Sequence, residues 1–195
     1  GHPSLPAKTV KELIALAKTR PGQLQYASGG VGSIQHMAME LFMNVTGTKM
    51  MHVPYKATYP ALIDIIAGHV PLMVIGSMSA LPQVGAGKAR AYGVTSAKRM
   101  TGAPDIPTIA EQGMPGYEVV QWFGLLTPAR TPHDIVAKLH AGVARALQDP
   151  EMKKRFIDDG MEAAPSSSPA EFHALIRSDL AKWARVVKDA GIRPE

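Results

Sequence analysis

Hydrophobic residues at the start of the chain recur first at the spacing of a helix and then in a short continuous run. Thr9 and Glu12 form a predicted capping box, and apolar residues follow at helical spacing until Pro21 and Gly22 end the helix. The apolar run at 24–27 is a predicted strand. A helix followed by a strand is therefore the first unit that the pattern predicts.

The same alternation continues as far as residue 75. The pattern predicts a helix from Ser33 to the TGT sequence at 46–48, a strand at 49–55, a helix at 60–67 and a buried strand at 70–75. This order, β-α-β-α-β with short connections, predicts an α/β fold. We expect a mostly parallel sheet with helices on both faces.

The pattern changes in the second half of the chain. A short helix and a strand at 89–95 precede a stretch that is rich in proline and glycine, and residues 117–128 then predict an extended, almost wholly apolar strand. Three helices follow, and we expect each to have a proline at its first position: Pro132, Pro150 and Pro169.

These three C-terminal helices are amphipathic and need a sheet to pack on. Their own segment contains only one candidate strand, at 161–164. We therefore expect them to pack on a surface that their segment does not supply.

Composition is that of an ordinary globular protein. The chain has 195 residues, 46% of them hydrophobic and 19% charged, which is enough for one large domain or two small ones. No apolar stretch approaches the roughly 18 residues of a membrane span, and no complete secretory leader is visible. We expect neither an integral membrane protein nor a complete secretory precursor.

The net charge of +5 raises the question of nucleic acid. Lys153, Lys154 and Arg155 form the only tight basic cluster, so the sequence favours a solvated surface that attracts anions in general, and no nucleic-acid partner is predicted. The absence of cysteine excludes a disulfide scaffold, a thiolate metal site and a cysteine nucleophile.

A glycine-rich turn joins the strand at 24–27 to the next helix. Backbone N–H groups and a helix dipole favour an anion at such a turn, although the third glycine of a dinucleotide site is replaced by Gln35. The alternative is a tight turn that only lets the helix pack on the strand. Because hydroxyl groups flank the glycines, the predicted ligand-binding residues are Ser28, Gly29, Gly30, Gly32 and Ser33.

The segment at 53–62 is a second candidate anion site of the same kind. It leaves a strand, presents Tyr55, Lys56 and Thr58, and enters a helix with Pro60 in its first turn, which suits a carboxylate or phosphate. The alternative is a capped turn with a solvated lysine. Both segments follow the C-terminal ends of strands, where open α/β sheets bind ligands.

Signals for catalysis and for metal binding are weak. The seven histidines are scattered, and we expect His36 and His52 to be structural. The sequence has no G-x-S-x-G elbow and no carboxylate pair in an apolar setting. We predict no catalytic residue, no metal ligand and no cofactor.

Several segments together carry a resemblance to a known family. The sequences YASGGVGSIQHMAMELF, MHVPYKATYPALIDIIAGHVPLM and WFGLLTPARTP resemble the extracytoplasmic solute receptors of tripartite tricarboxylate transporters, the Bordetella uptake gene (Bug) family. The resemblance covers essentially the whole chain. It implies a type II periplasmic binding fold of two lobes that closes on a small carboxylate and delivers it to membrane transporter subunits, without catalysis or a cofactor. It also implies a periplasmic location.

The resemblance divides the chain between the two lobes. Residues 3–120 correspond to the second, ligand-binding lobe, and residues 121–195 supply a strand and helices of a first lobe whose sheet the chain lacks. Family members usually carry a further N-terminal part, so we expect a truncated or cleaved polypeptide. Its orphaned helices are then expected to find another surface, such as that of a second copy in a homodimer.

One local departure from the family concerns specificity. Where many relatives have Phe-Asp-Asn-Leu-Pro, this chain has Val-Ile-Gly-Ser-Met at 74–78, and we add Ser77 to the predicted ligand-binding residues. The loss of an acidic side chain disfavours amino-acid ligands. It favours a di- or tricarboxylate, or an aromatic acid.

Two functions from other classes remain open. The glycine turn is also compatible with an α/β enzyme that acts on a small anionic substrate. A receptor-derived module that binds or signals to another protein, without a ligand, is the other alternative.

Overall fold

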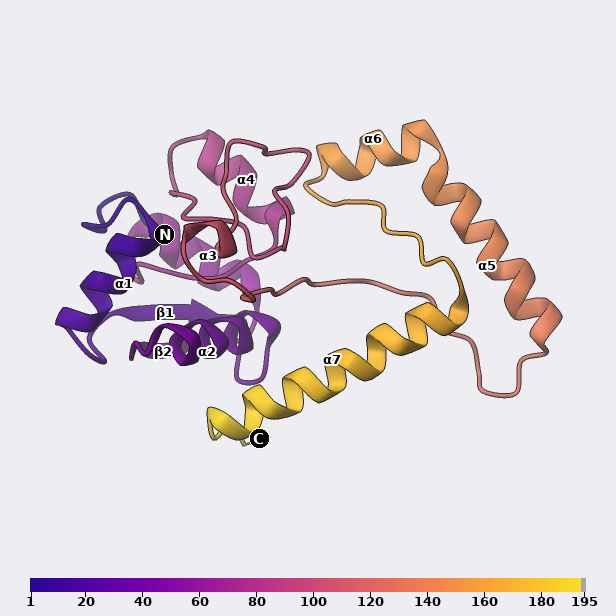
Figure 1. The fold of residues 1–195 in the computed structure, drawn as a ribbon. Coiled ribbons are helices and arrows are strands. Elements are labelled where there is room, and N and C mark those ends of the chain that lie inside the picture. The colour runs from indigo at the N-terminus through magenta and orange to yellow at the C-terminus, as the bar shows by residue number, and fades with distance from the viewer. Residues whose placement is uncertain (194–195) are drawn as a thin grey trace.

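Two parallel strands lie at the centre of the N-terminal part of the structure, a computed structural model that describes residues 1–193 (Figure 1). β1 pairs with β2 in parallel, with Tyr26 opposite His52 and Ser28 opposite Pro54. The helices and strands are α1 Val10–Thr19, β1 Gln25–Ser28, α2 Ile34–Thr46, β2 Met51–Pro54, α3 Thr58–Ala67, α4 Ser77–Gly85, the 3-10 helix η1 Ala110–Gln112, α5 His133–Gln148, α6 Pro150–Asp158 and α7 Pro169–Asp189.

The predicted strand at 70–75 lies beside β1 but forms only one bridge. Met73 bridges to Ala27 in parallel, and the Ala27 N–H donates to the Leu72 carbonyl over 2.8 Å. The neighbouring Pro71 carbonyl is bonded to the N-terminal loop, where the His2 N–H donates to it over 2.9 Å. The segment therefore occupies the place of a third parallel strand without a continuous ladder.

The predicted strand at 89–95 is likewise reduced to one bridge, between Val94 and Thr108. Here too the N-terminal loop intervenes, since the Arg90 N–H donates to the Gly1 carbonyl over 2.7 Å. The prediction of a full strand at 89–95 is therefore wrong.

Helices cover both faces of the strands, as the alternation of elements predicts. Successive residues of β1 face opposite sides, so Tyr26 joins the larger buried cluster with α1 and α2, whereas Ala27 joins a second cluster with α3. Local sequence determines where these helices begin and end. Thr9 caps α1 by accepting the Glu12 N–H over 3.2 Å, and Gly47 ends α2 in the left-handed conformation with φ +63°.

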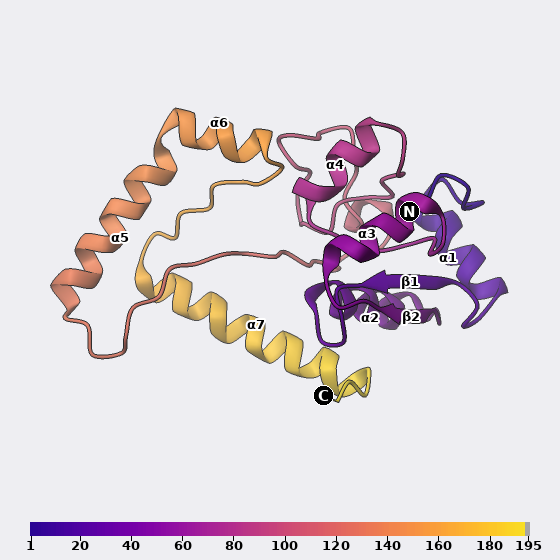
Figure 2. The same ribbon diagram turned by 180° about the vertical axis from the view of Figure 1, so that it is seen from behind.

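The C-terminal part leaves this unit as an extended segment and forms α5 away from it (Figures 1 and 2). The end of α6 then meets the start of α4, where Ser77 donates to the Gly160 carbonyl, and α7 returns to α2. Trp183 packs against the larger buried cluster and Val186 is buried, so the second half of α7 is part of the core. Pro150 and Pro169 occupy the first turns of their helices as predicted, whereas Pro132 is the N-cap of α5 rather than its first residue.

The predicted strands at 117–128 and 161–164 do not form. The Val119 N–H still donates to the Thr95 carbonyl over 2.8 Å, but beyond this point the first segment is extended and exposed. Phe123 is 80% exposed, and Leu125 and Leu126 are each 78% exposed. The reason is that, within residues 1–193, no strand lies alongside either segment.

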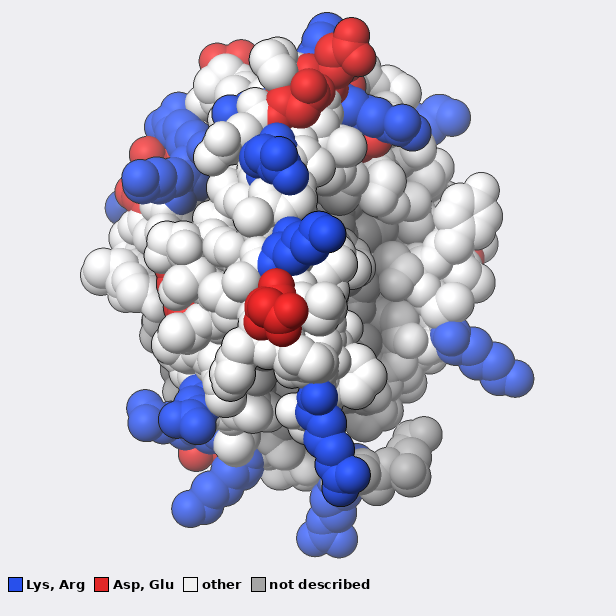
Figure 3. Space-filling view, turned by 90° about the vertical axis from the view of Figure 1, so that its right-hand side faces the viewer, with Lys and Arg blue, Asp and Glu red and all other residues white. Residues whose placement is uncertain are grey.

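Charged side chains are dispersed over the surface that carries α5 and α6. Figure 3 shows lysine and arginine side chains spread around this side, with a few acidic side chains between them. Within residues 1–193, no helix combines the length and the apolar character needed to cross a bilayer.

Candidate ligand-binding site

Three helices begin at the carboxyl edge of the parallel arrangement. α2 follows β1, α3 follows β2, and α4 follows the segment at 70–75. Ala57 before α3 and Gly76 before α4 provide no side-chain cap, and Pro60 in the first turn of α3 has no N–H. Uncapped N–H groups and aligned helix dipoles make this edge attractive to an anion.

The glycine turn, residues 28–33, has a shape that its own hydrogen bonds maintain. Gly30 has φ +128° and Gly32 has φ +75°, conformations that favour glycine. The Gly30 carbonyl accepts the Ser33 hydroxyl over 2.7 Å and the Ser33 N–H over 3.2 Å. The two serine side chains therefore stabilise the turn itself.

Several N–H groups at this edge have no acceptor. The N–H groups of Gly29, Val31 and Ile34 donate to nothing within residues 1–193, and the same holds for those of Thr58 and Tyr59 at the start of α3. Such groups can donate to the oxygens of a bound carboxylate.

The structure brings the glycine turn together with the 55–58 loop. The Tyr55 N–H donates to the Ser28 carbonyl over 3.0 Å, and the Gln35 side-chain amide donates to Thr58 Oγ1 over 3.1 Å. A Cβ atom at Gly29 would lie 3.0 Å from Thr58 Oγ1. The two segments that the sequence singles out thus form one continuous surface.

Two of the predicted side chains make hydrogen bonds within the protein. Ser28 is fully buried, and its Oγ lies 2.6 Å from His52 Nε2 and 3.1 Å from the Gly30 carbonyl oxygen. The Tyr55 hydroxyl donates to Asp64 over 2.5 Å, and this hydrogen bond raises the pKa of Tyr55 to about 12. In this structure, therefore, both hydroxyls make hydrogen bonds within the protein. Lys56 is exposed beside them.

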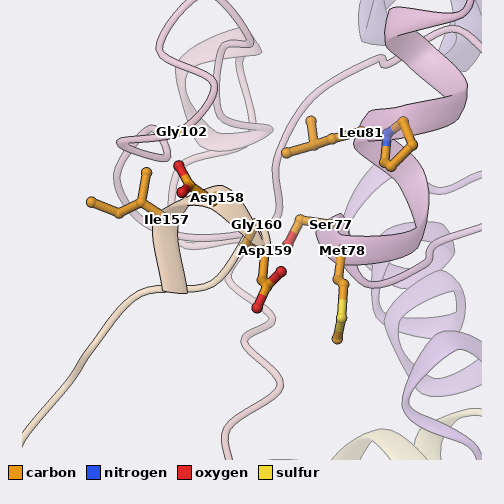
Figure 4. A pocket seen from close by; sticks show the side chains of 9 residues that line it. Ser77, Met78, Leu81, Gly102, Ile157, Asp158, Asp159 and Gly160 are labelled. Carbon is orange, nitrogen blue, oxygen red and sulfur yellow. Dashed lines mark hydrogen bonds between the residues drawn. The ribbon is translucent and has the colours of Figure 1, made fainter. Parts of the chain in front are cut away.

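Ser77, the remaining predicted residue, contacts the end of α6. Its hydroxyl donates to the Gly160 carbonyl, and a Cβ atom at Gly160 would lie 3.0 Å from the Met78 backbone nitrogen. Beside this contact, residues of α4 together with Asp158 and Asp159 line a hollow of about 340 Å³ (Figure 4). Ser77 here connects the two parts of the chain.

A buried polar cluster lies under the glycine turn. The sequence does not indicate that these residues belong to a ligand site. The rings of His36 and His52 stack with centroids 3.9 Å apart and planes inclined by 7°. The Tyr26 hydroxyl donates to Glu40 over 2.7 Å, and His36 Nε2 lies 3.5 Å from the same carboxylate oxygen. Only the spacing of His36 and Glu40, one helical turn apart, hints at this cluster in the sequence.

The cluster changes the proton affinity of its members. Burial, followed by the nearby charge of His36, lowers the pKa of His52 to about 4. Burial alone would raise the pKa of Glu40, but hydrogen bonds from His36 and Tyr26 bring that pKa below its usual value. Within residues 1–193, no three acidic or histidine side chains are arranged to hold a metal ion.

Comparison with known proteins identifies relatives along the whole chain. Residues 1–192 match the family described as tripartite tricarboxylate transporter family receptor. Protein BugT of Bordetella pertussis is 31% identical over 193 residues, which are 98% of this chain and 59% of BugT.

Two solved structures extend the likeness to the fold. Rpa4515 of R. palustris with adipate matches 100% of this chain and 64% of its own, with a TM-score of 0.88 and 36% identity. MatC (Rpa3494) from Rhodopseudomonas palustris with bound malate matches 95% of this chain and 64% of its own, with a TM-score of 0.81 and 31% identity. The expected periplasmic-binding-protein fold is confirmed.

The chain spans between 54% and 59% of the length of the first three curated relatives that it matches. The matched family consists of transport receptors, so the comparisons give no support to an enzymatic interpretation of the glycine turn. The resemblance seen in the sequence is confirmed, and the chain belongs to the tripartite tricarboxylate transporter receptor (Bug) family.

Proposed function

We propose that this protein acts in a periplasmic receptor that binds a small dicarboxylate at the glycine turn and the 55–58 loop and delivers it to a tripartite tricarboxylate-type membrane transporter. One observation carries the proposal. The starts of α2 and α3 contact each other through Gln35 and Thr58, and both present N–H groups without an acceptor among residues 1–193. We assign this ligand-binding role to the lobe at 3–120.

The chemistry of the site favours a carboxylate. Backbone N–H groups at two helix starts stabilise a negative charge without a cation, and the exposed Lys56 adds a positive charge at the rim. Solved relatives with adipate and with malate support a dicarboxylate in particular. The small and apolar residues at 74–78 suit a ligand without an amino group.

Isothermal titration calorimetry with adipate and with malate tests this function. We expect saturable 1:1 binding of at least one of the two acids. Lys56→Ala is expected to raise Kd by roughly threefold to tenfold, because it removes one screened charge from the rim. Lys88→Ala is the matched control: this lysine is also exposed but follows the C-terminal end of α4. Equal losses in both variants would contradict the assignment of the site.

A second candidate function, binding of another polypeptide, rests on a different observation. Phe123, Leu125 and Leu126 in the extended segment are at least 78% exposed, and Leu180 of α7 is 66% exposed. Large apolar side chains that gather on a surface mark interaction sites. We propose a second copy of this chain as the partner, in a homodimer formed through the segment at 120–126 and α7.

Sedimentation velocity separates the two candidates. A dimer that dissociates in the Phe123→Ser/Leu126→Ser double variant supports the interaction surface, and a wild-type monomer at all concentrations contradicts it. Titration with adipate in the same samples shows whether ligand binding depends on that assembly.

A further inference from the structure

The histidine cluster is attached to the glycine turn at two points. The Gly32 N–H donates to His36 Nδ1 over 3.1 Å, and Ser28 Oγ lies 2.6 Å from His52 Nε2. The two rings stack with centroids 3.9 Å apart, so both hydrogen bonds connect the turn to one pair of packed side chains. Ser28, at the end of β1, is fully buried, and only 6% of His36 is exposed.

The hydrogen bond from Gly32 indicates which nitrogen of a neutral His36 ring carries the proton. Its Nδ1 accepts the Gly32 N–H and therefore carries no proton, whereas its Nε2 faces Glu40 at 3.5 Å and carries the proton of the neutral ring. A second proton on Nδ1 would place two donors against each other. Protonation of His36 therefore removes the bond that fixes Gly32.

Other charged and titratable groups surround this ring. Tyr26 of β1, His52 of β2 and Glu40 of α2 contact it or its hydrogen-bond partners. Lys49 and Asp189 line a hollow beside Glu40, where α7 packs on α2. Two stacked rings cannot both be charged without repulsion, and His52 titrates at a lower pH than a free histidine.

We propose that His36 is a positioning residue for ligand binding, holding the glycine turn in its binding shape in the neutral form and releasing it when protonated. The inference rests on the proposed function, because it assigns a regulation to the same site. Glu40 compensates the added positive charge, so the lost bond to Gly32 governs the outcome at the turn. Affinity for a dicarboxylate falls as the pH falls.

Two substitutions separate positioning from bulk packing. His36→Asn retains an acceptor that can take the place of Nδ1 but does not titrate, whereas His36→Leu removes the acceptor. At pH 7.5 we expect His36→Asn to bind adipate within about threefold of wild type and His36→Leu to bind about tenfold more weakly, as for one lost hydrogen bond.

The pH profile is the readout that a structural role would not change. Adipate itself gains protons as the pH falls, so the quantity compared is the ratio of wild-type Kd to His36→Asn Kd. We expect this ratio to rise by about fivefold to tenfold between pH 7.5 and pH 5.5. A ratio that stays constant would overturn the inference.

A measurement without ligand distinguishes failure of this inference from failure of the proposed function. In ¹H–¹⁵N spectra, the Gly32 amide resonance is expected to titrate with His36 in the wild type and to stay unchanged in His36→Asn. If no acid binds but Gly32 titrates in this way, the proposed function fails and the coupling stands. If Gly32 does not titrate, the inference is wrong whatever binds.

Discussion

The contact between the glycine turn and α3 predicts a specific effect of Gly29→Ala. The added Cβ would lie 3.0 Å from Thr58 Oγ1 and 3.3 Å from the Thr58 nitrogen, closer than the roughly 3.5–4.0 Å of an ordinary contact. Gly29 has no positive φ, so alanine brings no backbone strain there. The start of α3 must therefore move away by a few tenths of an ångström.

The size of the effect follows from two opposing contributions. Overpacking at a close contact costs about 1–3 kcal/mol, and the loss of glycine entropy in the unfolded chain returns about 0.4–1 kcal/mol. We expect the free energy of unfolding to fall by about 1 kcal/mol. Because the two sets of N–H groups separate, Kd for adipate should rise about tenfold, which is about 1.4 kcal/mol.

Urea denaturation and calorimetry measure these two quantities. Gly76→Ala is the matched control: Gly76 stands at the same edge with φ −58°, and its added Cβ meets nothing within 4 Å. A further change, Thr58→Ala in the Gly29→Ala background, should recover stability through a coupling energy of about 0.5 kcal/mol or more. If Gly29→Ala is as stable as wild type and binds adipate equally well, the two loops do not form one site.

Four further predictions concern stability. Tyr117→Phe removes a buried hydroxyl that donates to the Ala38 carbonyl over 3.0 Å, so urea denaturation should show a loss of about 1 kcal/mol, and no loss would refute the bond. Phe123→Ser, at an 80% exposed site, should change the free energy of unfolding of the monomer by less than about 0.5 kcal/mol, and a larger loss would place Phe123 in a packed environment. The pKa of His52 is lowered to about 4 by burial, so the unfolded chain takes up a proton at a higher pH than the folded protein does. The contribution of His52 to the free energy of unfolding is therefore present above the unfolded pKa of 6.5 and is lost as the pH falls towards 4. The pKa of Glu111 is lowered by the Thr108 N–H and by Arg99, so its contribution is lost below pH 4.5, and stability measured from pH 7 to pH 4 should fall less below pH 4.5 in Glu111→Gln than in wild type.

Local sequence predicts the elements whose boundaries it encodes. Ser33 caps α2 by accepting the His36 N–H over 3.3 Å, and Gly47 ends the helix in a conformation that favours glycine. Both signals lie within a few residues of the element they control. The same holds for Thr9 at the start of α1.

The sequence wrongly predicts strands at 89–95 and 117–128, because these segments carry no such local signal of their partner. A strand forms only beside another strand that pairs with its backbone, whereas an apolar run indicates only that the segment tends to be buried. In this structure the Arg90 N–H donates to the Gly1 carbonyl of the N-terminal loop instead of to a strand. Within residues 1–193, no strand lies beside Phe123. Periodicity cannot show which segment supplies the ladder.

The sequence indicates that the two segments of the candidate site lie at one edge, but it does not indicate the direction of their side chains. Strand ends place the glycine turn and the 55–58 loop at one edge, which the sequence indicates. Whether Ser28 faces solvent or the interior depends on the register of β1 with β2, and that register also brings His52 beneath the turn. His36 and His52 are 16 positions apart and meet only through this pairing.

The most direct test of the central claim is a ¹H–¹⁵N spectrum of the wild-type protein titrated with adipate. The account predicts that the largest shifts fall on the amides of Gly29, Val31, Ile34 and Thr58, whose N–H groups have no acceptor within residues 1–193. Shifts confined to other parts of the chain, or none at millimolar adipate, would contradict binding at the glycine turn.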